Sequence, residues 1–393
     1  MAKIMAVNAG SSSIKFQLLE MPEETVITSG VMERIGLAEG IFTIKYNGKK
    51  EETHPVLPTH AEGVELLLET LVSKGIVKSL DEISGVGHRV VQGGEYFKDS
   101  ALVNDEVIAK IDELKDLAPL HNPAHIIGIK AFQQALPNVP QVVVFDTVFH
   151  QTMPEENYLY ALPYEWCTEY KIRRYGAHGT SHKFVALRAN ELLGRNDTKL
   201  ITCHIGNGAS ISAVVNGKCL NTSMGLTPNA GLIMGSRCGD IDATIVPYMI
   251  EKTGLTPREM DTVLNKKSGL LGISGISSDS RDIEDGIKAG NERCILAQKM
   301  YVRRIIDYIV KYYFQMDGCD AIIFTAGVGE NSIATRASIV EGLHLLGIEL
   351  DPELNDCRGK ETLITTATSK IPCYVIPTNE ELMIARDTYE LAK

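Results

Sequence analysis

The chain has 393 residues, of which 44% are hydrophobic and 23% charged, and its formal net charge is −11 at pH 7. This length suggests two or three domains or one large one, and the composition excludes collagen-like, low-complexity and disordered proteins. The acidic excess opposes binding to nucleic acid phosphates and anionic lipids, so we expect neither nucleic acid nor a membrane as a partner. No apolar run is long enough to span a bilayer or to form the core of a signal peptide.

The cysteines give a further indication of where the protein works. There are eight of them, and no two form a CxxC pair. In a chain of this length, that spacing indicates neither a disulfide framework nor a zinc site. We therefore expect free thiols and a soluble protein of the reducing cytoplasm.

In the first half of the chain, strands and helices are predicted to alternate after an N-terminal hairpin. Residues 4–18 predict a strand, a Gly/Ser turn and a second strand, because apolar and polar side chains alternate around the turn. Three helices with apolar faces and one buried strand are predicted over residues 61–78, 105–117, 124–135 and 140–145. Asn122 and Pro123 predict a cap and an N1 proline for the third helix, and Asp146 lies where the strand ends.

The second half begins with a repeat of the first pattern. Residues 200–215 have the same strand–turn–strand plan as residues 4–18, about half a chain length later. This repeat predicts a duplicated α/β domain with a mixed sheet in each copy and a cleft between the copies, the alternative being a chance match of two hairpins. The remaining predicted elements are helices over 180–193 and 291–316, strands over 320–325 and 372–377, and helices that start at 332 and 378. We expect domains of 1–150 and 151–380, with a C-terminal helix at about 381–393 that could pack back on the first domain.

Three polar, glycine-containing turns are candidates for holding phosphate, at residues 8–13, 206–210 and 327–331. Glycine lets a ligand approach the backbone closely, and the N–H groups of such turns can form an anion-binding nest. The third turn leads into a predicted helix N-terminus, which also favours phosphate. The sequence has no GxxxxGK(S/T) motif and no GxGxxG that follows a strand and opens a helix, which excludes a P-loop site and disfavours a Rossmann dehydrogenase.

These turns belong to a set of motifs that spans the chain. The motifs are NAGSSSIK (8–15), GHRVVQGGE (87–95), FDTVFHQTMP (145–154), RRYGAHGTSH (173–182), HIGNGAS (204–210), MGSRCGDID (234–242), SSDSRD (277–282), FTAGVGEN (324–331) and TNEEL (378–382). Together they resemble the acetokinase family, within the superfamily of acetate and sugar kinases, actin and heat-shock chaperone ATPases. The resemblance implies duplicated actin-like ATPase (ribonuclease H-like) domains. It also implies a reversible, magnesium-dependent, direct in-line phosphoryl transfer from ATP to acetate that gives acetyl phosphate and ADP.

This reaction brings two anions together, so it depends on positioning and on neutralisation of charge. The resemblance implies which positive side chains supply that charge. Arg89 would pair with the substrate carboxylate, Arg237 would spread over the phosphoryl oxygens, and His178 would donate a hydrogen bond to the transferred phosphoryl group. Asp146 corresponds to the family's catalytic aspartate. Since acetate is already ionised at neutral pH, we expect Asp146 to orient Arg237 or a metal-bound water rather than to act as a base.

The other implied contacts fall into three groups. The acyl methyl group is lined by Val91, Leu120 and Pro228. The nucleotide contacts are Ser11, Ser13, Lys15, His204, Ile205, Gly206, Asn207, Gly208, Asp279, Ser280, Arg281, Gly327, Val328, Gly329, Glu330 and Asn331. Asn8 and Glu380 are implied to hold Mg²⁺, for which Mn²⁺ could substitute. Thr378 and Glu381 have the spacing of a capping box, so we expect Glu381 to be structural.

Two other functions remain open. A propionate or butyrate kinase of the same family would differ only in the volume of the acyl pocket, whereas an actin-like or chaperone-like ATPase would use its nucleotide as a conformational switch. The family also implies a homodimer, for which the Tyr/Ile face of residues 300–313 is either a contact surface or the buried side of a core helix. We expect His54, His60, His125 and His344 to be structural.

Overall fold

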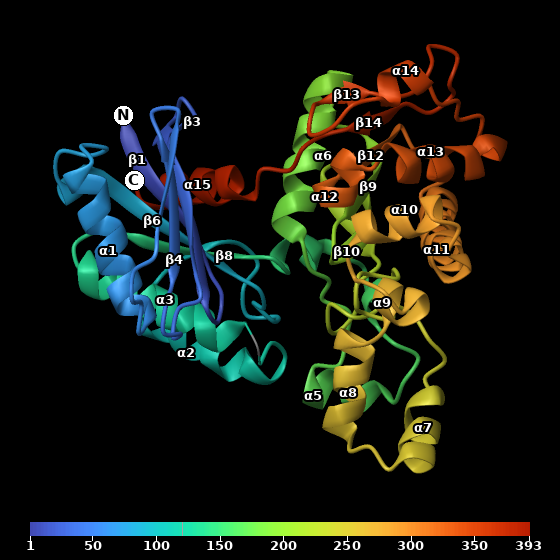
Figure 1. The fold of residues 1–393 in the computed structure, drawn as a ribbon, viewed down its shortest axis with the longest axis horizontal. Helices are drawn as coiled ribbons and strands as arrows, with labels where there is room; N and C mark the ends of the chain where they lie inside the picture. Colours follow the sequence, from blue (N-terminus) through green and yellow to red (C-terminus); the bar gives the residue numbers. More distant parts are fainter. Residues whose placement is uncertain (120) are drawn as a thin grey trace. The chain divides into compact units, whose positions relative to one another are not determined.

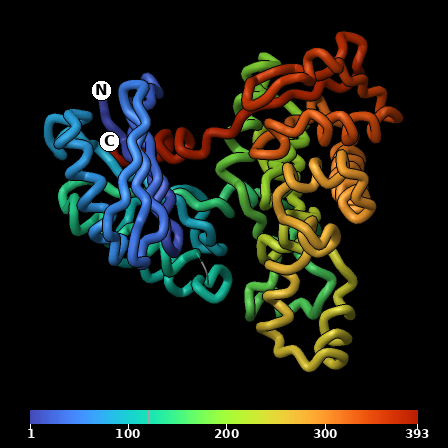
Figure 2. The backbone as a smooth tube through the Cα atoms, in the orientation of Figure 1, coloured from blue at the N-terminus to red at the C-terminus, as the bar shows by residue number. Residues whose placement is uncertain are grey.

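The computed structural model describes residues 1–119 and 121–393, which form two compact units (Figure 1). The first unit comprises residues 1–149 together with 379–393, and the second comprises residues 150–378. The C-terminal segment thus belongs to the first unit, where it lies among the N-terminal strands (Figure 2).

The first unit contains one mixed β-sheet. Its strands are β1 (Ala2–Ala9), β2 (Ser13–Met21), β3 (Thr25–Glu33), β4 (Ile41–Tyr46), β5 (Lys49–Thr53), β6 (Ile83–Val90), β7 (Ala101–Leu102) and β8 (Gln141–Phe145). They pair in the order β5-β4-β3-β2-β1-β6-β8-β7, in which β1, β6 and β8 are parallel and the other neighbours are antiparallel. Its helices are α1 (His60–Ser73), α2 (Asp105–Glu113), α3 (Asn122–Ala135) and α15 (Glu380–Leu391), with short 3₁₀ helices at Leu80–Glu82, Leu114–Asp116 and Val148–Thr152.

Successive side chains of a strand point to opposite faces of the sheet, so both faces of this sheet have side chains to bury. Helices cover both faces (Figure 1). On one face, Met5 packs in a buried cluster with Leu67 of α1 and Phe132 of α3. On the other face, α15 packs against β1 and β6. The absence of a side chain at Gly87 makes this packing possible, since a Cβ there would lie 2.1 Å from Thr388 Oγ1 of α15.

The second unit also contains one mixed sheet. Its strands are β9 (Lys199–Ile205), β10 (Ala209–Val215), β11 (Lys218–Thr222), β12 (Ala321–Thr325), β13 (Thr362–Leu363) and β14 (Cys373–Val375), in the order β11-β10-β9-β12-β14-β13. Its helices are α4 (Glu155–Tyr158), α5 (Tyr164–Tyr170), α6 (Gly179–Leu193), α7 (Ile245–Thr253), α8 (Pro257–Lys266), α9 (Gly269–Ser274), α10 (Ser280–Lys288), α11 (Glu292–Gln315), α12 (Ala326–Asn331), α13 (Ile333–Gly342) and α14 (Pro352–Asn355), with a 3₁₀ helix at His344–Leu346.

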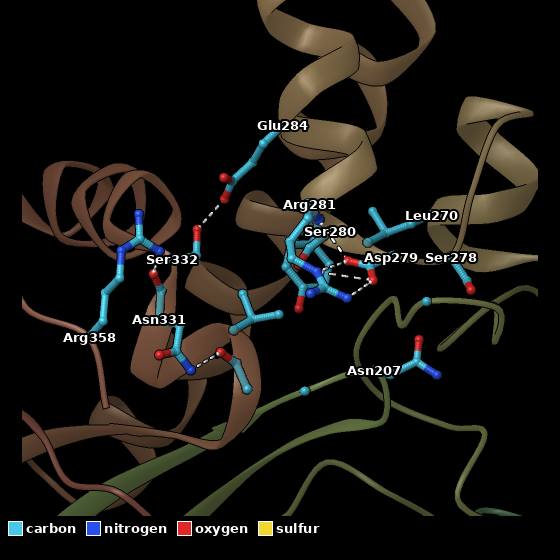
Figure 3. Close-up of a pocket in the computed structure, with 15 residues that line it drawn as sticks. Asn207, Leu270, Ser278, Asp279, Ser280, Arg281, Glu284, Asn331, Ser332 and Arg358 are labelled. Atoms are coloured by element: carbon cyan, nitrogen blue, oxygen red, sulfur yellow. Dashed lines mark hydrogen bonds and ion pairs between the residues drawn. The ribbon is translucent and has the colours of Figure 1, made fainter. Parts of the chain in front are cut away.

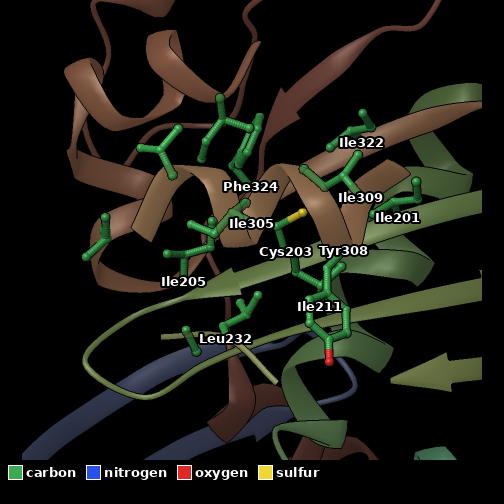
Figure 4. Packing of buried hydrophobic residues seen from close by; sticks show 14 of the residues in the cluster. Ile201, Cys203, Ile205, Ile211, Leu232, Ile305, Tyr308, Ile309, Ile322 and Phe324 are labelled. Atoms are coloured by element: carbon green, nitrogen blue, oxygen red, sulfur yellow. The ribbon is translucent and has the colours of Figure 1, made fainter. Parts of the chain in front are cut away.

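The core of the second unit lies between its sheet and the long helix α11 (Figure 4). Ile201 on β9, Ile211 on β10 and Phe324 on β12 are fully buried there. From α11, Ile305 and Ile309 enter the same cluster. The Tyr/Ile side of this helix is therefore the buried side of a core helix, and it is not available as a contact surface.

The two sheets share one topology. Strands β3-β2-β1-β6-β8-β7 correspond in order to β11-β10-β9-β12-β14-β13, with the same sequence of antiparallel and parallel neighbours. The hairpins at residues 4–18 and 200–215 are equivalent parts of this pattern. The predicted duplication of an α/β domain with a mixed sheet is therefore confirmed, while β4 and β5 extend the first sheet beyond the shared part.

Some local predictions are wrong. Residues 326–331 form helix α12 instead of a glycine turn, with Ala326 at φ 65° and Ser332 as the cap of the following helix α13. Helix α3 already includes Asn122, and its N-cap is His121. The Asn122 side chain is buried and donates to backbone carbonyl oxygens, so it serves tertiary packing and not the helix end.

Within residues 1–119 and 121–393, no helix combines the length and apolar character needed to cross a bilayer. All eight cysteines are free thiols, as expected. Of these, Cys203 and Cys373 are buried in the sheet of the second unit.

Candidate active site

The turn between β1 and β2 is held by two buried histidines. Gly10 closes the turn by donating its N–H to the carbonyl oxygen of Ser13 at 2.8 Å. His60 Nε2, at the start of α1, lies 2.7 Å from the carbonyl oxygen of Gly10, and His125 Nδ1 of α3 lies 2.8 Å from that of Ala9. Since a carbonyl oxygen can only accept, both imidazoles donate. These two histidines are structural, as expected, and their task is to fix the first polar turn.

Three predicted residues meet at the ends of the parallel strands of the first unit. Arg89 lies near the end of β6, Asp146 directly follows β8, and Asn8 lies near the end of β1. The Arg89 Nε lies 3.2 Å from Asp146 Oδ1, its Nη2 contacts Asp146 Oδ2, and its Nη1 lies 3.4 Å from Asn8 Oδ1. The Asp146 side chain is 1% exposed. The guanidinium of Arg89 offsets the free-energy cost of burying the negative charge of Asp146. Within this unit, Asp146 binds Arg89, whereas we expected it to orient Arg237 or a metal-bound water.

Glu380, the first residue of α15, belongs to the same electrostatic site. The pKa of Glu380 is raised to about 7, mainly because the carboxyl group is buried. The positive charge of Arg89 opposes this rise, and the negative charge of Asp146 adds to it. Burial lowers the pKa of Arg89, but the negative charges of Asp146 and Glu380 outweigh burial, so that the pKa of Arg89 is raised. A cation placed beside Glu380 would therefore be stabilised.

The capping-box prediction for Thr378 and Glu381 is wrong. The N-cap of α15 is Asn379, whose Oδ1 accepts the N–H of Leu382 at 3.1 Å. Glu381 instead forms an ion pair with Lys15 on β2. The asparagine takes the capping position because its short side chain reaches the third helical N–H group, which leaves Glu381 to hold a lysine that we predicted to contact the nucleotide.

The other predicted residues of the first unit differ in their surroundings. Ser11 is exposed in the β1–β2 turn, and Ser13 is half-buried at the start of β2. Val91 is buried directly after β6. Leu120 lies outside the described residues.

In the second unit, His178 is held through both its backbone and its side chain. It precedes α6 with φ 59°, in the left-handed region that is uncommon for residues other than glycine. His150 Nε2 lies 3.0 Å from the carbonyl oxygen of Ala177 and so fixes the preceding peptide. The imidazole of His178 stacks on that of His204, with ring centroids 4.0 Å apart, and its Nδ1 lies 2.9 Å from Ser210 Oγ.

His178 and Arg237 converge beside Gly208 in the β9–β10 turn. A Cβ placed on Gly208 would lie 3.4 Å from Arg237 Nη1 and 3.6 Å from His178 Nε2. Arg237 Nη1 also donates to the carbonyl oxygen of Pro228 at 3.1 Å, and burial lowers the pKa of its guanidinium. Through this carbonyl, half-buried Pro228 orients the arginine. An anion beside Gly208 could thus receive hydrogen bonds from two side chains.

A pocket of about 560 Å³ is lined in part by Gly206 and Asn207 of the β9–β10 turn (Figure 3). The predicted nucleotide residues that line it are Gly206, Asn207, Asp279, Ser280, Arg281, Gly327, Val328 and Asn331. This volume lies within the range of small-molecule and cofactor sites. Asp279 also caps α10 by accepting the N–H of Arg281 at 2.9 Å, and hydrogen bonds from that arginine lower the pKa of Asp279 to about 2.

The remaining predicted nucleotide residues lie elsewhere in the described part of the second unit. His204 Nδ1 lies 2.8 Å from Ser181 Oγ, and Ile205 is buried in the core. Gly329 is buried in α12. The carboxylate of Glu330 accepts the backbone N–H groups of Ala326 at 2.8 Å and of Thr378 at 3.1 Å, so it closes the start of α12.

Glu284, Ser332 and Arg358 also line the pocket and were not predicted (Figure 3). Glu284 lies four residues after Ser280 on α10, and this i, i+4 spacing could have identified it. The Ser332 hydroxyl donates to Glu284 Oε1 at 2.5 Å. Arg358 donates to the carbonyl oxygen of Asn331 from a loop after α14, and its local sequence carries no signal for this position.

Among residues 1–119 and 121–393, no three His, Cys, Asp or Glu side chains are placed to hold a metal ion together. A magnesium site does not need such a cluster, since Mg²⁺ keeps several waters and takes one or two carboxylates together with substrate phosphates. The amide oxygen of Asn8 and the carboxylate of Glu380 are the types of oxygen ligand that this ion prefers. The donor set of the first unit therefore fits magnesium.

Comparisons with known proteins agree over the whole chain. The sequence profile of the acetokinase family matches residues 3–386. The acetate kinase of Geobacillus kaustophilus is 58% identical over 394 residues, which cover 100% of both chains. The crystal structure of Porphyromonas gingivalis acetate kinase has a TM-score of 0.95 at 47% identity, and that of a propionate kinase from Francisella tularensis has a TM-score of 0.94 at 41% identity, each with 100% of both chains covered. This chain belongs to the acetokinase family.

Proposed function

We propose that this chain is an acetate kinase, which transfers the γ-phosphoryl group of ATP reversibly to a carboxylate oxygen of acetate and so forms acetyl phosphate and ADP. The observation that carries the proposal is the convergence of Arg237 and His178 on Gly208, beside a pocket of nucleotide size. Membership of the acetokinase family supports the same activity.

The nucleotide would occupy the pocket between α10 and α12. Asp279, Ser280 and Arg281 would lie nearest the adenosine, and the phosphates would extend along Gly206 and Gly327, where the backbone is open to close approach. This arrangement would bring the γ-phosphate toward Gly208. Beyond the pocket, the proposed nucleotide contacts are Ser11, Ser13, Lys15, His204, Ile205, Gly329 and Glu330.

Acetate would bind to the end of the Arg89 guanidinium. Asp146 already occupies the edge formed by Nε and Nη2, and it fixes the plane of the group. The edge formed by Nη1 and Nη2 is the one that can pair with a substrate carboxylate through two hydrogen bonds. Val91, Leu120 and Pro228 are proposed to surround the methyl group of the acyl substrate.

The chemistry of the transfer needs positioned charge and no base. A carboxylate oxygen forms a bond to the γ-phosphorus while the bond from that phosphorus to the β,γ-bridging oxygen breaks, and no proton is exchanged. Carboxylic acids of this kind ionise with a pKa of about 4–5, so acetate is already an anion at neutral pH. Arg237 and His178 would stabilise the charge on the phosphoryl oxygens, and Arg89 would align the attacking carboxylate. Exclusion of water would prevent hydrolysis of ATP.

Asn8 and Glu380 would hold Mg²⁺, or Mn²⁺ in its place, together with phosphate oxygens of the nucleotide. When bound, the ion would neutralise charge on the β- and γ-phosphates. The raised pKa of Glu380 supports this assignment, because a buried carboxylate among other negative charges gains most from a nearby cation. Asn8 is tied to Arg89 by a contact of 3.4 Å, which would link the metal site to the acetate site.

We also propose an organisation around these sites. Residues 1–150 with the C-terminal helix would provide the acyl-substrate side, and residues 151–380 would provide the nucleotide side. The protein would be a homodimer, for which exposed Tyr164 and Trp166 on α5 and Tyr248 on α7 offer apolar surface. Its eight free thiols suit the reducing cytoplasm.

The test is formation of acyl phosphate, trapped with hydroxylamine, from ATP and acetate, propionate or butyrate. Acetate should give the highest kcat/KM, and one added methylene should lower it by about 10- to 100-fold, since a methylene in an apolar pocket is worth about 1–3 kcal/mol. A higher value with propionate or butyrate would instead identify a kinase for the longer acid. ATP hydrolysis at a rate indifferent to acetate, without acyl phosphate, would indicate a nucleotide-switch ATPase and contradict the proposal.

A further inference from the structure

A chain of hydrogen bonds leads from the sheet of the second unit to His178. Thr202 Oγ1 on β9 lies 2.7 Å from Nδ1 of His182 on α6. The other ring nitrogen of His182, Nε2, lies 2.8 Å from Oγ of Ser210 on β10. Ser210 Oγ in turn lies 2.9 Å from His178 Nδ1. Thr202, His182 and Ser210 are completely buried, so the order of donors along this chain is set by the protein and not by solvent.

The protonation of His182 limits the order of donors to two possibilities. Burial, and then the neighbouring His150 and His204, lower the pKa of His182 well below its usual value. The ring is therefore neutral, with one nitrogen that donates and one that accepts. Whichever nitrogen carries the proton decides the direction of every other hydrogen bond in the chain.

In one order, Thr202 donates to Nδ1 of His182. Nε2 of His182 then carries the proton and donates to Ser210, and the Ser210 hydroxyl donates to Nδ1 of His178. Every donor in this order has an acceptor at 2.9 Å or less. His178 then carries its own proton on Nε2.

The opposite order leaves Thr202 with a poor acceptor. If His182 Nδ1 donates to Thr202, the Thr202 hydroxyl is left with the carbonyl oxygen of Ser212, which is 3.5 Å away and at the limit of hydrogen bonding. His178 would then carry its proton on Nδ1. Its Nε2 lone pair would face the phosphoryl oxygens and repel them.

We propose that Thr202, His182 and Ser210 are positioning residues that hold His178 in the tautomer with its proton on Nε2. The proposal rests on the function proposed above, in which His178 donates a hydrogen bond to the transferred phosphoryl group. Nε2 is the ring nitrogen beside Gly208, 3.6 Å from the position of a Cβ on that residue. The three residues thus act through His178 and touch no substrate.

The charged and titratable groups around His178 favour a donor that is neutral. Nη1 of the Arg237 guanidinium lies 3.4 Å from the same Gly208 Cβ position. His204 stacks on the imidazole, and His182 lies behind Ser210. A neutral imidazole with its proton on Nε2 can donate without a second positive charge beside the guanidinium.

His204, which stacks on His178, has a related but shorter arrangement, in which a threonine and a serine hydroxyl lead to its Nδ1 with no histidine between them. The Thr378 hydroxyl donates to Ser181 Oγ at 2.8 Å, and Ser181 Oγ lies 2.8 Å from Nδ1 of His204. A serine hydroxyl therefore faces Nδ1 of both His178 and His204. In each case a threonine at the far end can set the direction.

The tautomer can be measured in the substrate-free, full-length protein with ¹⁵N-labelled histidine side chains. Long-range ¹H–¹⁵N correlation spectra distinguish protonated from unprotonated ring nitrogens, and the His178→Asn variant identifies the signals of His178. We expect protonated Nε2 and unprotonated Nδ1 in the wild-type protein. A wild-type spectrum with the proton on Nδ1 would overturn the proposal without any variant.

The decisive variant is Thr202→Val, which keeps the shape of the side chain and removes a hydroxyl that is three hydrogen bonds away from His178. With the Thr202 hydroxyl removed, Nδ1 of His182 faces a methyl group in either order, so the bias toward one tautomer is lost and the Nδ1-protonated form of His178 should become populated beside the Nε2 form. The kcat should fall by up to about tenfold, part of the loss that removal of a whole transition-state donor produces, and KM should change less than twofold. Thr202→Ser restores the hydroxyl and should restore both the tautomer and kcat. Thr222→Val is the matched control, because it removes another buried hydroxyl from the same sheet and should leave the His178 signals in place.

An unchanged tautomer in Thr202→Val would overturn the proposal even if kcat falls, since the loss would then reflect packing. If Thr202→Val does not fold, the wild-type spectrum and Ser210→Ala, which removes the last donor to His178, decide the question in the same way. A shifted tautomer in Thr202→Val would support the positioning role of Thr202, His182 and Ser210 even if the wild-type protein formed no acyl phosphate. That combination would contradict the proposed function and still support the chain of hydrogen bonds that sets the tautomer of His178.

Discussion

Arg89 and Asp146 are joined by two contacts between the ends of neighbouring parallel strands: Nε to Oδ1 at 3.2 Å, and Nη2 to Oδ2. The carboxylate is almost completely buried, while the guanidinium keeps some exposure, at 18% of its side-chain surface. The aspartate is thus the fixed member of the pair, and the arginine is the member that can meet a ligand. We therefore propose that Asp146 holds Arg89 in place rather than transferring a proton.

Asp146→Asn tests that task. Loss of the charge should let Arg89 move and should lower kcat/KM for acetate by about 10- to 100-fold, as expected when a hydrogen bond between charged groups worth about 1.5–3 kcal/mol is weakened. The reduction should be present at pH 8 and should not grow toward pH 5, because no proton leaves the nucleophile and loss of the Asp146 charge can only lower the pKa of Glu380. Steady-state kinetics over this range provide the measurement, and Asp112→Asn, at an exposed ion pair on the same unit, is the matched control. Near-normal turnover at high pH, lost only as acetate becomes protonated, would identify Asp146 as a base.

The pairing of Arg89 with Asp146 marks the limit of what the sequence predicts. The hairpins at residues 4–18 and 200–215, and hence the duplication, are predictable because alternation and turn residues act locally. The ion pair joins residues 57 positions apart, and it depends on the parallel pairing of β6 with β8. A motif can identify both residues, but only the fold decides which arginine the aspartate binds.

Helix α12 shows the same limit in secondary structure. Its sequence, AGVGEN, has the glycine content of a turn, and local propensity predicts one. The carboxylate of Glu330 accepts the N–H of Ala326 at the start of the helix and that of Thr378, which lies 48 residues further along the chain. This tertiary contact stabilises a helix that propensity disfavours. Arg358, which lines the pocket between α10 and α12, is likewise placed by a distant loop.

The ion pair between Lys15 and Glu381 predicts competition for the lysine. If Lys15 contacts the nucleotide, it must leave Glu381 to do so, and its side chain is 59% exposed, so the pair is weak. Glu381→Gln should therefore lower KM for ATP by at most about fivefold, the equivalent of about 1 kcal/mol for a pair with one exposed partner. Lys15→Met should raise KM for ATP, with little change in KM for acetate. Unchanged KM for ATP in both variants would show that Lys15 does not bind the nucleotide.

Two buried histidines of the first unit should make its stability sensitive to acid. Burial lowers the pKa of His88 to about 4, and burial together with the charge of Arg89 lowers the pKa of His125 to about 3, whereas an unfolded histidine titrates near 6.5. Between these values the unfolded chain binds protons that the folded chain does not, so stability is fully present above about pH 6.5 and is lost as the pH falls. Each histidine should contribute up to about 1.4 kcal/mol per pH unit in this window.

Urea unfolding of the wild-type protein and of His88→Gln at pH 7, 6 and 5 measures this contribution. A glutamine amide can still donate to Gln141, which His88 Nε2 contacts at 2.8 Å, but it does not titrate. The free energy of unfolding should fall less steeply with acid in His88→Gln than in the wild-type protein. Equal slopes would mean that His88 takes up its proton at the same pH in the folded protein as in the unfolded chain, against the direction of its pKa shift.

Gly208→Ala is a steric probe of the space between Arg237 and His178. The added methyl group would meet Arg237 Nη1 at 3.4 Å and His178 Nε2 at 3.6 Å, which are ordinary contact distances, and the glycine is not in the left-handed region of φ. The variant should therefore fold with little change in Tm. If the phosphoryl group passes between these two donors, the methyl group occupies its place, and kcat should fall about 100-fold or more, on the scale of losing one transition-state donor. Arg237→Ala, which removes the guanidinium itself, should lower kcat by about a thousandfold. A normal kcat in Gly208→Ala, with Arg237→Ala inactive, would place the reacting phosphorus away from Gly208 and on another side of the guanidinium.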